Sequence, residues 1–186
     1  MNVLTLYGSA RRNGSSASIA EAFLQSLPKN DRILRCRTAE LHIAPCRNCG
    51  GCAEGRPCVI RDDFPGILRD FQCADVLVLA APIYYYGMPA PLKLCLDRLH
   101  AWPPAMEQKP KTIVLLTVSA DDALSTSRPL IDQMKLICSY RGWKLETLWI
   151  GGINSPRNLT LEHYRQIEAF AHAHIASRED QTTDAP

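Results

Sequence analysis

The chain has 186 residues, 46% of them hydrophobic and 22% charged, a composition typical of one soluble domain that buries a full core. Its formal net charge of +2 is too small to favour nucleic acid or an anionic membrane as a partner. The sequence has neither an apolar run long enough to span a membrane nor the pattern of a signal peptide. We therefore expect a cytoplasmic protein, whose thiols stay reduced unless they bind metal or do redox work.

In the first half of the chain, short apolar runs alternate with amphipathic stretches. The predicted elements are strands at 2–8, within 31–41 and at 74–82, and helices at 15–27 and 62–72. Asp63 stands at the expected N-cap of the helix at 62–72, and Pro65 lies in its first turn. The strand at 74–82 is almost continuously apolar, which is typical of a strand covered on both faces.

The second half continues the same alternation. Helices are predicted at 89–102, 126–142 and 160–176, and strands at 111–120 and 144–153. Thr160 is the expected N-cap of the last helix. Residues 1–176 are therefore predicted to form a single domain, and the polar segment 177–186 is predicted to be disordered.

Strands and helices that alternate in this way predict a doubly wound α/β sandwich with right-handed crossovers. Ligands of such folds lie at the carboxyl ends of the strands, near the point where the strand order reverses. The loops after the first, third and fourth predicted strands are therefore the first places to look for a site.

The loop after the first strand, GSARRNGSS, joins hydroxyl groups, two arginines and the start of a helix. The N–H groups and the dipole at a helix N-terminus favour a terminal phosphate. The loop lacks the lysine of a Walker A motif and the glycine triplet of a dinucleotide fold. An ordinary βα loop with a serine N-cap is the alternative.

The loop after the third strand, APIYYYGMPAPLK, has three consecutive tyrosines where polar turn formers are usual. Aromatic side chains at a strand's carboxyl end suit a flat, partly apolar ring. Packing against a neighbouring subunit or helix is the alternative. A phosphate loop and a ring-binding loop together fit flavin mononucleotide (FMN) better than either loop does alone.

Three segments, GSARRNGSS, PCRNCGGCAEGRPCVIRDDF and PIYYYGMPAPLKLCLDR, occur in this order along the chain. They resemble the signature segments of the flavodoxin-like NAD(P)H-dependent FMN reductases, in particular those of the iron–sulfur flavoprotein branch. The resemblance implies a five-stranded parallel sheet in the order 2-1-3-4-5 and non-covalently bound FMN. It also implies a homodimer or homotetramer in which a neighbouring subunit comes near the flavin.

The resemblance also assigns the cofactor contacts. Those expected at the phosphate are Ser9, Arg11, Asn13, Ser15 and Ser16. Those expected along the ring are Pro82, Ile83, Tyr84, Tyr85, Tyr86 and Gly87. The loop after the fourth strand is expected to add Ser119 and Ala120, although Asp121 and Asp122 follow them where small residues are usual.

The stretch PCRNCGGCAEGRPC at 45–58 contains four cysteines, Cys46, Cys49, Cys52 and Cys58. Ferredoxin cysteine runs use similar spacing, so a 4Fe–4S cluster is the preferred interpretation, and the resemblance strengthens it. Structural zinc sites usually separate their two Cys-x-x-Cys pairs by a dozen or more residues. Redox-active thiols, zinc and cysteines that only line an interface are the alternatives.

The remaining candidates have ordinary structural interpretations. Cys36, Cys73, Cys95 and Cys138 fall at or inside predicted strands and helices, where cysteine behaves as a small hydrophobic residue. Lys93 and Asp97 are four residues apart on a predicted helix and are expected to form an ion pair, with Arg98 beside them. Asp62 and Asp63 could suggest a carboxylate site, but helix capping explains Asp63 more simply.

The sequence therefore predicts an FMN-dependent oxidoreductase, with catalytic residues that it does not identify. In one route, a cluster held by the four cysteines exchanges single electrons with FMN, with a ferredoxin-type donor or a small-molecule acceptor as partner. In the other, NAD(P)H reduces FMN by hydride transfer, and a quinone, flavin, nitro compound or metal ion is the acceptor. A non-catalytic electron carrier or redox sensor, and a fold recruited for one biosynthetic substrate, are the further alternatives.

Overall fold

The computed structural model describes residues 1–101 and 111–175. Its strands are β1 (Asn2–Tyr7), β2 (Arg32–Arg37), β3 (Val76–Pro82), β4 (Thr112–Val118) and β5 (Lys144–Ile150). Its α-helices are α1 (Ser15–Gln25), α2 (Phe64–Cys73), α3 (Ala90–Arg98), α4 (Leu124–Arg141) and α5 (Leu161–His174). The predicted disordered segment 177–186 lies outside the described residues, as does the last residue of the helix predicted at 89–102.

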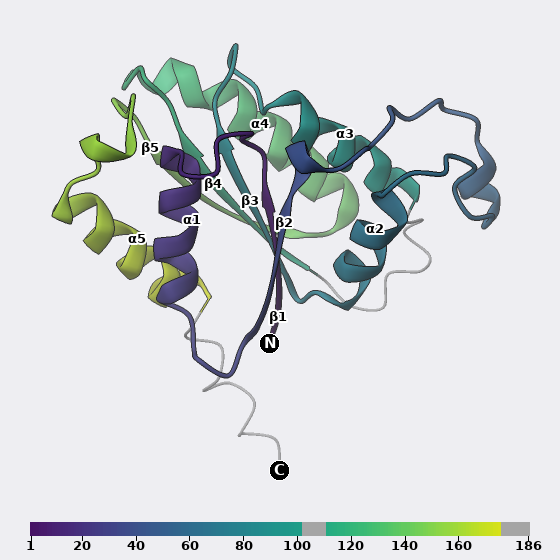
Figure 1. The fold of residues 1–186 in the computed structure, drawn as a ribbon, viewed down its shortest axis with the longest axis horizontal. Coiled ribbons are helices and arrows are strands. Elements are labelled where there is room, and N and C mark those ends of the chain that lie inside the picture. Colours follow the sequence, from purple (N-terminus) through teal and green to yellow (C-terminus); the bar gives the residue numbers. More distant parts are fainter. Residues whose placement is uncertain (102–110, 176–186) are drawn as a thin grey trace.

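The five strands form one sheet in the order β2-β1-β3-β4-β5, and every neighbouring pair is parallel (Figure 1). This is the doubly wound arrangement that the alternation of strands and helices predicts, and the expected strand order is confirmed. The order reverses between β1 and β3, so the loops that leave these two strands diverge and open a crevice at their carboxyl ends.

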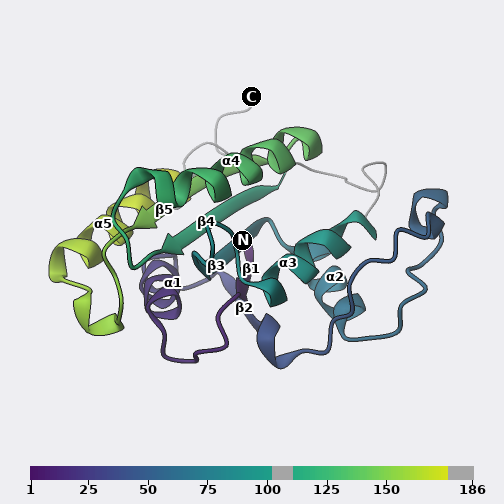
Figure 2. The same ribbon diagram turned by 90° about the horizontal axis from the view of Figure 1, so that it is seen from above.

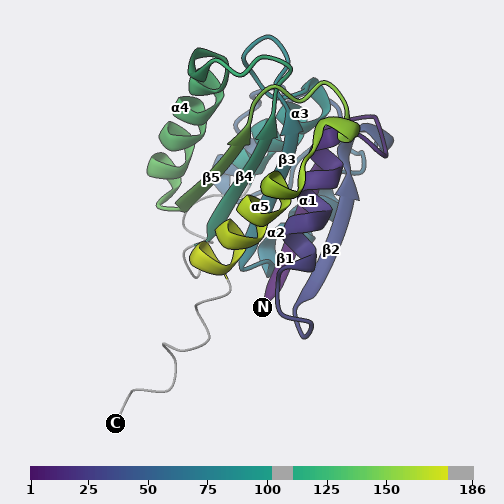
Figure 3. The ribbon, with the colours of Figure 1, turned by 90° about the vertical axis from the view of Figure 1, so that its left-hand side faces the viewer.

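Helices cover both faces of the sheet, as the apolar character of β3 and β4 requires (Figures 2 and 3). Helices α1 and α5 pack on one face, and α2, α3 and α4 pack on the other. Alternate strand residues supply the two cores: Leu77 and Leu79 face α2–α4, whereas Val76 and Val78 face α1 and α5. None of the helices in the described residues combines the length and apolar character needed to cross a membrane.

Asp63 and Thr160 both stand at the N-cap positions predicted for them, but only the Thr160 side chain caps its helix. Thr160 caps α5 as predicted, since its hydroxyl accepts from the His163 N–H at 3.4 Å. Asp63 precedes α2, but its carboxylate accepts from the His42 N–H at 2.8 Å instead of capping the helix. The first N–H of α2, that of Phe64, donates to Asp62 at 3.1 Å. Sequence position alone does not show which of the two adjacent carboxylates accepts from the start of the helix. In the structure, Asp63 accepts from the His42 N–H, and Asp62 accepts from the helix.

The exit from β5 is closely packed against the loop after β4. A Cβ atom added to Gly151 would lie 2.7 Å from both the Asp122 Cα and the Trp149 Cζ2, and 3.1 Å from the Asp121 carbonyl oxygen. Because two of these three neighbours are backbone atoms, they cannot rotate away. Glycine at 151 therefore lets the two loops meet.

We expect Gly151→Ala to lower the free energy of unfolding by about 1–3 kcal/mol, because the added methyl group forces the two loops apart. Urea unfolding followed by circular dichroism measures the change. Gly66→Ala in α2 is the matched control, since its added Cβ meets only the Arg69 Nη2 at 3.9 Å. That variant should gain roughly 0.5–1 kcal/mol. Equal stability of the two variants would contradict the packing described at Gly151.

Candidate functional site

A cavity of about 650 Å³ opens at the carboxyl ends of β1, β3, β4 and β5. Ten residues singled out in the sequence and the neighbouring Gly14 line it together. The ten are Ser9, Arg11, Asn13, Ser15, Ser16, Pro82, Ile83, Tyr84, Ser119 and Ala120. Tyr85, Tyr86 and Gly87 do not line it. The fold thus brings the three expected loops to one space large enough for a nucleotide-sized ligand.

The first of these loops presents an open helix N-terminus to the cavity. The N-cap of α1 is Gly14, which has no side chain, and Ser15 is the first helical residue. The alternative of a serine N-cap is therefore wrong. The first N–H groups of a helix have no partners within it, and here no side chain caps them, so they are available to an anion. The Ser9 hydroxyl accepts from the Arg11 N–H at 3.1 Å, which folds the loop back over the helix start.

The second loop is a two-residue hairpin turn. Tyr84 and Gly87 exchange both of their backbone hydrogen bonds, at 2.9 and 3.0 Å. Tyr85 and Tyr86 between them have φ angles of 47° and 64°, a conformation that turns usually assign to asparagine or glycine. This places the Tyr85 side chain fully in solvent, and that of Tyr86 is also exposed.

The third loop contributes shape more than free polar groups. The Ser119 hydroxyl donates to the Asp121 carbonyl at 2.6 Å and accepts from the Trp149 indole N–H at 2.8 Å. Asp121 in turn ties this loop to the start of α4, since its carboxylate accepts from the Ala123 N–H just before the helix and from the Thr126 hydroxyl in its first turn, both at 2.9 Å. The acidic residue that departs from the resembled pattern thus has a structural role beside the cavity.

A fourth loop, after β5, completes the cavity and was not singled out in the sequence. Its lining residues are Ile153, Asn154, Ser155 and Pro156. The loop is held to the third one, because the Ile153 N–H donates to the Ser119 carbonyl at 2.8 Å. Gly152 and Pro156 are turn signals directly after a strand, and the rule that ligands lie at strand carboxyl ends applies to β5 as it does to β1.

The cysteine loop, residues 45–61, leaves the body of the protein beyond α2 and α3, away from the strand-end cavity (Figures 1 and 2). Cys46, Cys49, Cys52 and Cys58 all line one second cavity of about 40 Å³, together with Arg98 and His100. All four are free thiols. No three Cys, His, Asp or Glu side chains within 1–101 and 111–175 converge closely enough to hold a single metal ion.

Left-handed backbone shapes this loop. Gly50 and Gly55 have φ angles of 75° and 77° and flank a short 3-10 turn, Gly51–Glu54, that carries Cys52. The Asn48 N–H points at the Cys46 sulfur at 3.5 Å. Backbone N–H groups directed at cysteine sulfurs are a feature of sites that hold thiolates. Glycine at 50 and 55 allows these turns without the strain that a side chain would add.

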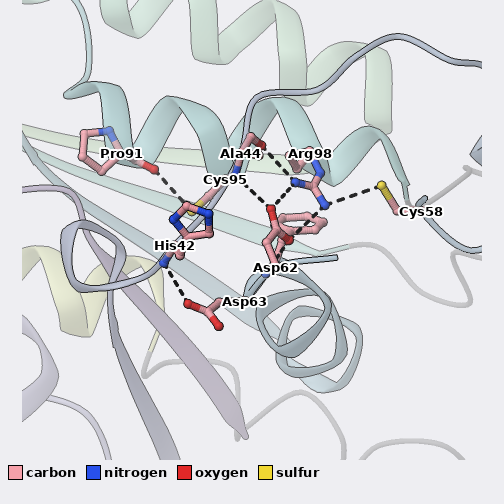
Figure 4. A network of polar contacts seen from close by, with 9 residues as sticks. His42, Ala44, Cys58, Asp62, Asp63, Pro91, Cys95 and Arg98 are labelled. Atoms are coloured by element: carbon pink, nitrogen blue, oxygen red, sulfur yellow. Dashed lines mark hydrogen bonds and ion pairs between the residues drawn. The ribbon is translucent and has the colours of Figure 1, made fainter. Parts of the chain in front are cut away.

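A buried ion pair closes the base of the cysteine loop (Figure 4). The Arg98 guanidinium donates to the Asp62 carboxylate at 2.7 and 3.3 Å, and both side chains are 1% exposed. Arg98 also donates to the Ala44 carbonyl at 2.9 Å and to the Cys58 sulfur at 3.5 Å. The expected Lys93–Asp97 pair is confirmed at 2.5 Å on the helix surface. Arg98, treated in the sequence only as its neighbour, is the residue that reaches the cysteines.

Asp62 makes the stability of this region depend on pH. Burial alone would raise the pKa of this carboxyl, but hydrogen bonds from Arg98 and from the N–H groups of Ala44 and Phe64 lower it below its ordinary value. A depressed pKa in the folded state means that the stabilisation is complete above the unfolded pKa of about 4. It is lost as the pH falls through the folded pKa.

We therefore expect the stability difference between the wild type and Asp62→Asn to be largest at pH 7 and to shrink below about pH 4. Urea unfolding of both proteins between pH 7 and pH 2.5 measures this difference. Asp97→Asn, which alters only the exposed pair, should track the wild type throughout. A difference that does not change with pH would show that Asp62 gains nothing from ionisation.

Cys95 and Cys138 are buried and Cys36 is half-buried, as expected of structural cysteines, whereas Cys73 is exposed at the end of α2. Burial raises the pKa of the Cys95 thiol to about 12 and that of Cys138 to about 11.

We expect iodoacetamide at pH 8 to label Cys46, Cys49 and Cys73 in the metal-free folded protein, and to leave Cys95 and Cys138 unmodified. Peptide mass spectrometry of a time course measures each rate. Labelling of Cys95 as fast as Cys49 would contradict the packing of α3.

A family model described as NADPH-dependent FMN reductase matches residues 1–143. An iron-sulfur flavoprotein of Archaeoglobus fulgidus is 29% identical over 100 residues, which cover 53% of this chain and 46% of that protein. The match thus spans about half the length of this relative.

Two further comparisons extend over most of the chain. A Bacillus subtilis protein named as an NAD(P)H-dependent FMN-containing oxidoreductase is 25% identical over 171 residues, covering 88% of this chain and 91% of that protein. An azoreductase from Bacillus anthracis superposes with a TM-score of 0.71 at 18% identity, covering 93% of this chain and 98% of that one. At this identity the structural likeness shows the fold alone.

Proposed function

Because the chain belongs to the NADPH-dependent FMN reductase family, we propose that it is an FMN-dependent oxidoreductase whose cofactor occupies the strand-end cavity. The observation that carries this proposal is the open N-terminus of α1 at one end of a 650 Å³ cavity. An uncapped helix start fits a terminal phosphate, and the remaining volume suits a nucleotide-sized ring system.

The residues at the phosphate end have complementary tasks. The N–H groups of Ser15 and Ser16 at the start of α1 donate to the phosphate, and the hydroxyls of both residues add further donors. Arg11 offers a positive charge from the rim, since it is exposed. Asn13 adds an amide, and Ser9 holds the loop in the shape that presents these groups.

At the ring end, Pro82, Ile83 and Tyr84 form one wall and the loops after β4 and β5 form the other. Ser119 and Ala120 fix the second wall, because the Ser119 hydroxyl and backbone are already committed to neighbouring groups. The hairpin turn holds Tyr84 at the rim, where aromatic surface excludes water from one side of the cavity. Tyr85 and Tyr86 point away and are free to meet an acceptor or a second subunit.

When bound, FMN supplies the exchange of one or two electrons, and the chain supplies position and surroundings. We propose NAD(P)H as the donor and a small-molecule electron acceptor as the second substrate. The walls of the cavity orient both against the ring, and the rigid ends of β3 and β4 keep that orientation fixed.

The finer part of the proposal is a 4Fe–4S cluster held by Cys46, Cys49, Cys52 and Cys58. The donor set fits, because four free thiols line one space and a cluster binds each thiolate to a different iron, so its ligands surround a space instead of converging on one ion. A cubane needs more room than 40 Å³, so the loop must widen to accept it, and the left-handed glycines 50 and 55 permit that. Under this proposal, the cysteine loop passes single electrons between a ferredoxin-type donor and the flavin.

A cluster-free NAD(P)H-dependent reductase is the second candidate, favoured by the small size of the cysteine cavity. Anaerobic mixing of the FMN-loaded protein with NADH, NADPH or a reduced ferredoxin separates the two. Rapid bleaching of the flavin by a pyridine nucleotide supports hydride transfer, and bleaching by ferredoxin alone supports the cluster route. A non-catalytic carrier or sensor would show no steady turnover of NAD(P)H with any acceptor. If neither a pyridine nucleotide nor ferredoxin reduces the flavin, that result contradicts the proposed function.

We propose that the protein forms a homo-oligomer in the cytoplasm. An apolar groove of about 420 Å³ runs between the ends of α3 and α4, and Leu136 and Tyr140 stand exposed beside it. Exposed apolar patches of this kind support self-association. Eight free thiols within the described residues favour a reducing compartment. Sedimentation equilibrium tests the oligomer, and a monomer at micromolar concentration would contradict it.

A further inference from the structure

Arg98 is buried more completely than any charged side chain normally is. It is 1% exposed and is the largest of the fully buried side chains. Its guanidinium lies over the Phe64 ring, 4.6 Å from the ring centre, which walls the charge off from water. Its Nε is buried without a hydrogen-bond partner among the described residues. Burying an ion pair costs desolvation that its attraction often fails to repay, so stability alone is a poor reason for this arrangement.

The contacts of Arg98 join the two ends of the cysteine loop. Ala44 lies just before the loop, and Asp62 lies just after it. The Ala44 carbonyl accepts from Arg98 at 2.9 Å, and the Ala44 N–H donates to Asp62 at 2.9 Å. Asp62 in turn accepts from Arg98 and from the first N–H of α2. One guanidinium and one carboxylate thus fasten the entry and the exit of the loop to each other and to the end of α3 (Figure 4).

The same guanidinium also reaches the loop itself. Its Nη2 lies 3.5 Å from the Cys58 sulfur, within hydrogen-bond distance for sulfur. Among the four loop cysteines, Cys58 is the one whose sulfur accepts a hydrogen bond from a charged side chain of the described residues. Arginine is suited to both tasks, because its fork can bind a carboxylate with two nitrogens and still direct N–H groups elsewhere.

We propose that Arg98 is the positioning residue of the cysteine loop, which fastens the base of the loop and directs a cationic donor at Cys58, so that a cluster held there is easier to reduce. The second half of this inference rests on the proposed 4Fe–4S site. Reduction of a cluster held there would add one electron, and so one negative charge, from a ferredoxin-type donor that is itself oxidised by one electron, and no bond in the protein would form or break. A buried positive charge beside a ligating sulfur favours that more negative state.

Three variants test the proposal in the full-length protein. Arg98→Lys keeps the charge but loses the fork. Arg98→Met combined with Asp62→Asn removes both charges, so that no unpaired ion stays buried, and the amide introduced at position 62 keeps an oxygen that accepts from the backbone. Asp97→Asn on the same helix is the control, since it breaks only the exposed pair with Lys93. Thermal melts followed by circular dichroism establish that each variant folds.

The first measurement uses metal-free protein and trypsin, with cleavage followed at the bond after Arg47. The bond after Arg56 precedes Pro57 and resists trypsin, and the substitution at position 62 itself alters the bond after Arg61. We expect the initial rate of cleavage within the loop to rise about tenfold in the double variant, because an unfastened base lets the loop open locally. The control should match the wild type, and Arg98→Lys should fall between them. Cleavage of the double variant at the wild-type rate would overturn the fastening role.

The second measurement is a redox titration of the reconstituted cluster, followed by electron paramagnetic resonance. The equilibrium constant for reduction should fall about tenfold in the double variant, a shift of about 59 mV to lower potential for one electron. The potential of Arg98→Lys should lie close to that of the wild type, because this variant keeps the positive charge. An unchanged potential overturns the electronic role. If the wild type takes up no cluster, the proposed site and the second half of this inference both fail, while the cleavage rates still decide the first half.

Discussion

We expect the replacement of Ser15 by glutamate to lower the affinity of the protein for FMN by at least about 100-fold, equivalent to about 2.7 kcal/mol. Ser15 is the first residue of α1 and lines the strand-end cavity. A carboxylate there accepts from the open N–H groups of the helix and repels the phosphate that would otherwise bind them. The same carboxylate favours the helix dipole, so the variant should fold at least as well as the wild type.

Fluorescence titration of FMN into the cofactor-free protein measures this effect. Ser15→Gln is the matched control, because it adds the same bulk without the charge, and it should lose far less affinity than the glutamate variant. The difference between the two variants should diminish at high salt, because the repulsion is electrostatic. An affinity of Ser15→Glu within threefold of the wild type would mean that the phosphate does not bind at the start of α1.

The second large effect is on stability. Arg98→Met alone should lower the free energy of unfolding by about 3–5 kcal/mol, because it leaves the Asp62 carboxylate buried without its counter-charge. Urea unfolding of the metal-free protein at pH 7 measures the loss. Adding Asp62→Asn should restore most of it, since the double variant buries no unpaired charge. A single variant within about 1 kcal/mol of the wild type would show that the pair adds little to the fold.

The fold is predictable from this sequence because its signals are local. Each strand is a short apolar run and each helix an amphipathic stretch, so the alternation alone implies the doubly wound sheet that the structure has. The ends of the elements are harder to predict, since two or three residues at a helix end can be either helical or extended. The helix predicted from 126 starts at Leu124, and Asp121, outside the predicted range, accepts a hydrogen bond from the Thr126 hydroxyl in its first turn.

The candidate site is only partly predictable. Loops that follow β1, β3 and β4 carry recognisable residues, and the fold brings them to one cavity. The loop after β5 was missed because its residues are ordinary and only its position at a strand end marks it. Tyr85 and Tyr86 are exposed because they form a left-handed turn. Tyrosine is uncommon at such positions, so the sequence does not predict this turn.

The Arg98–Asp62 pair was missed for a different reason. The two residues are 36 positions apart, and no local pattern links residues so distant. One signal was present: Arg98 lies three residues after Cys95 and two after Leu96, on the helix that buries both. A charged residue within the apolar part of a helix usually has a buried partner. That partner was overlooked because Asp62 was considered only together with Asp63, for which helix capping was a sufficient explanation.

The proposed function requires FMN in the strand-end cavity, and its finer part requires a 4Fe–4S cluster in the cysteine loop. Anaerobic purification, followed by a visible spectrum with flavin, iron and sulfide analysis, tests both parts at once. The account predicts one FMN and about four irons with matching sulfide per chain. Flavin without iron would contradict the cluster and leave a cluster-free reductase. A colourless protein that binds no added FMN would contradict the account at its base.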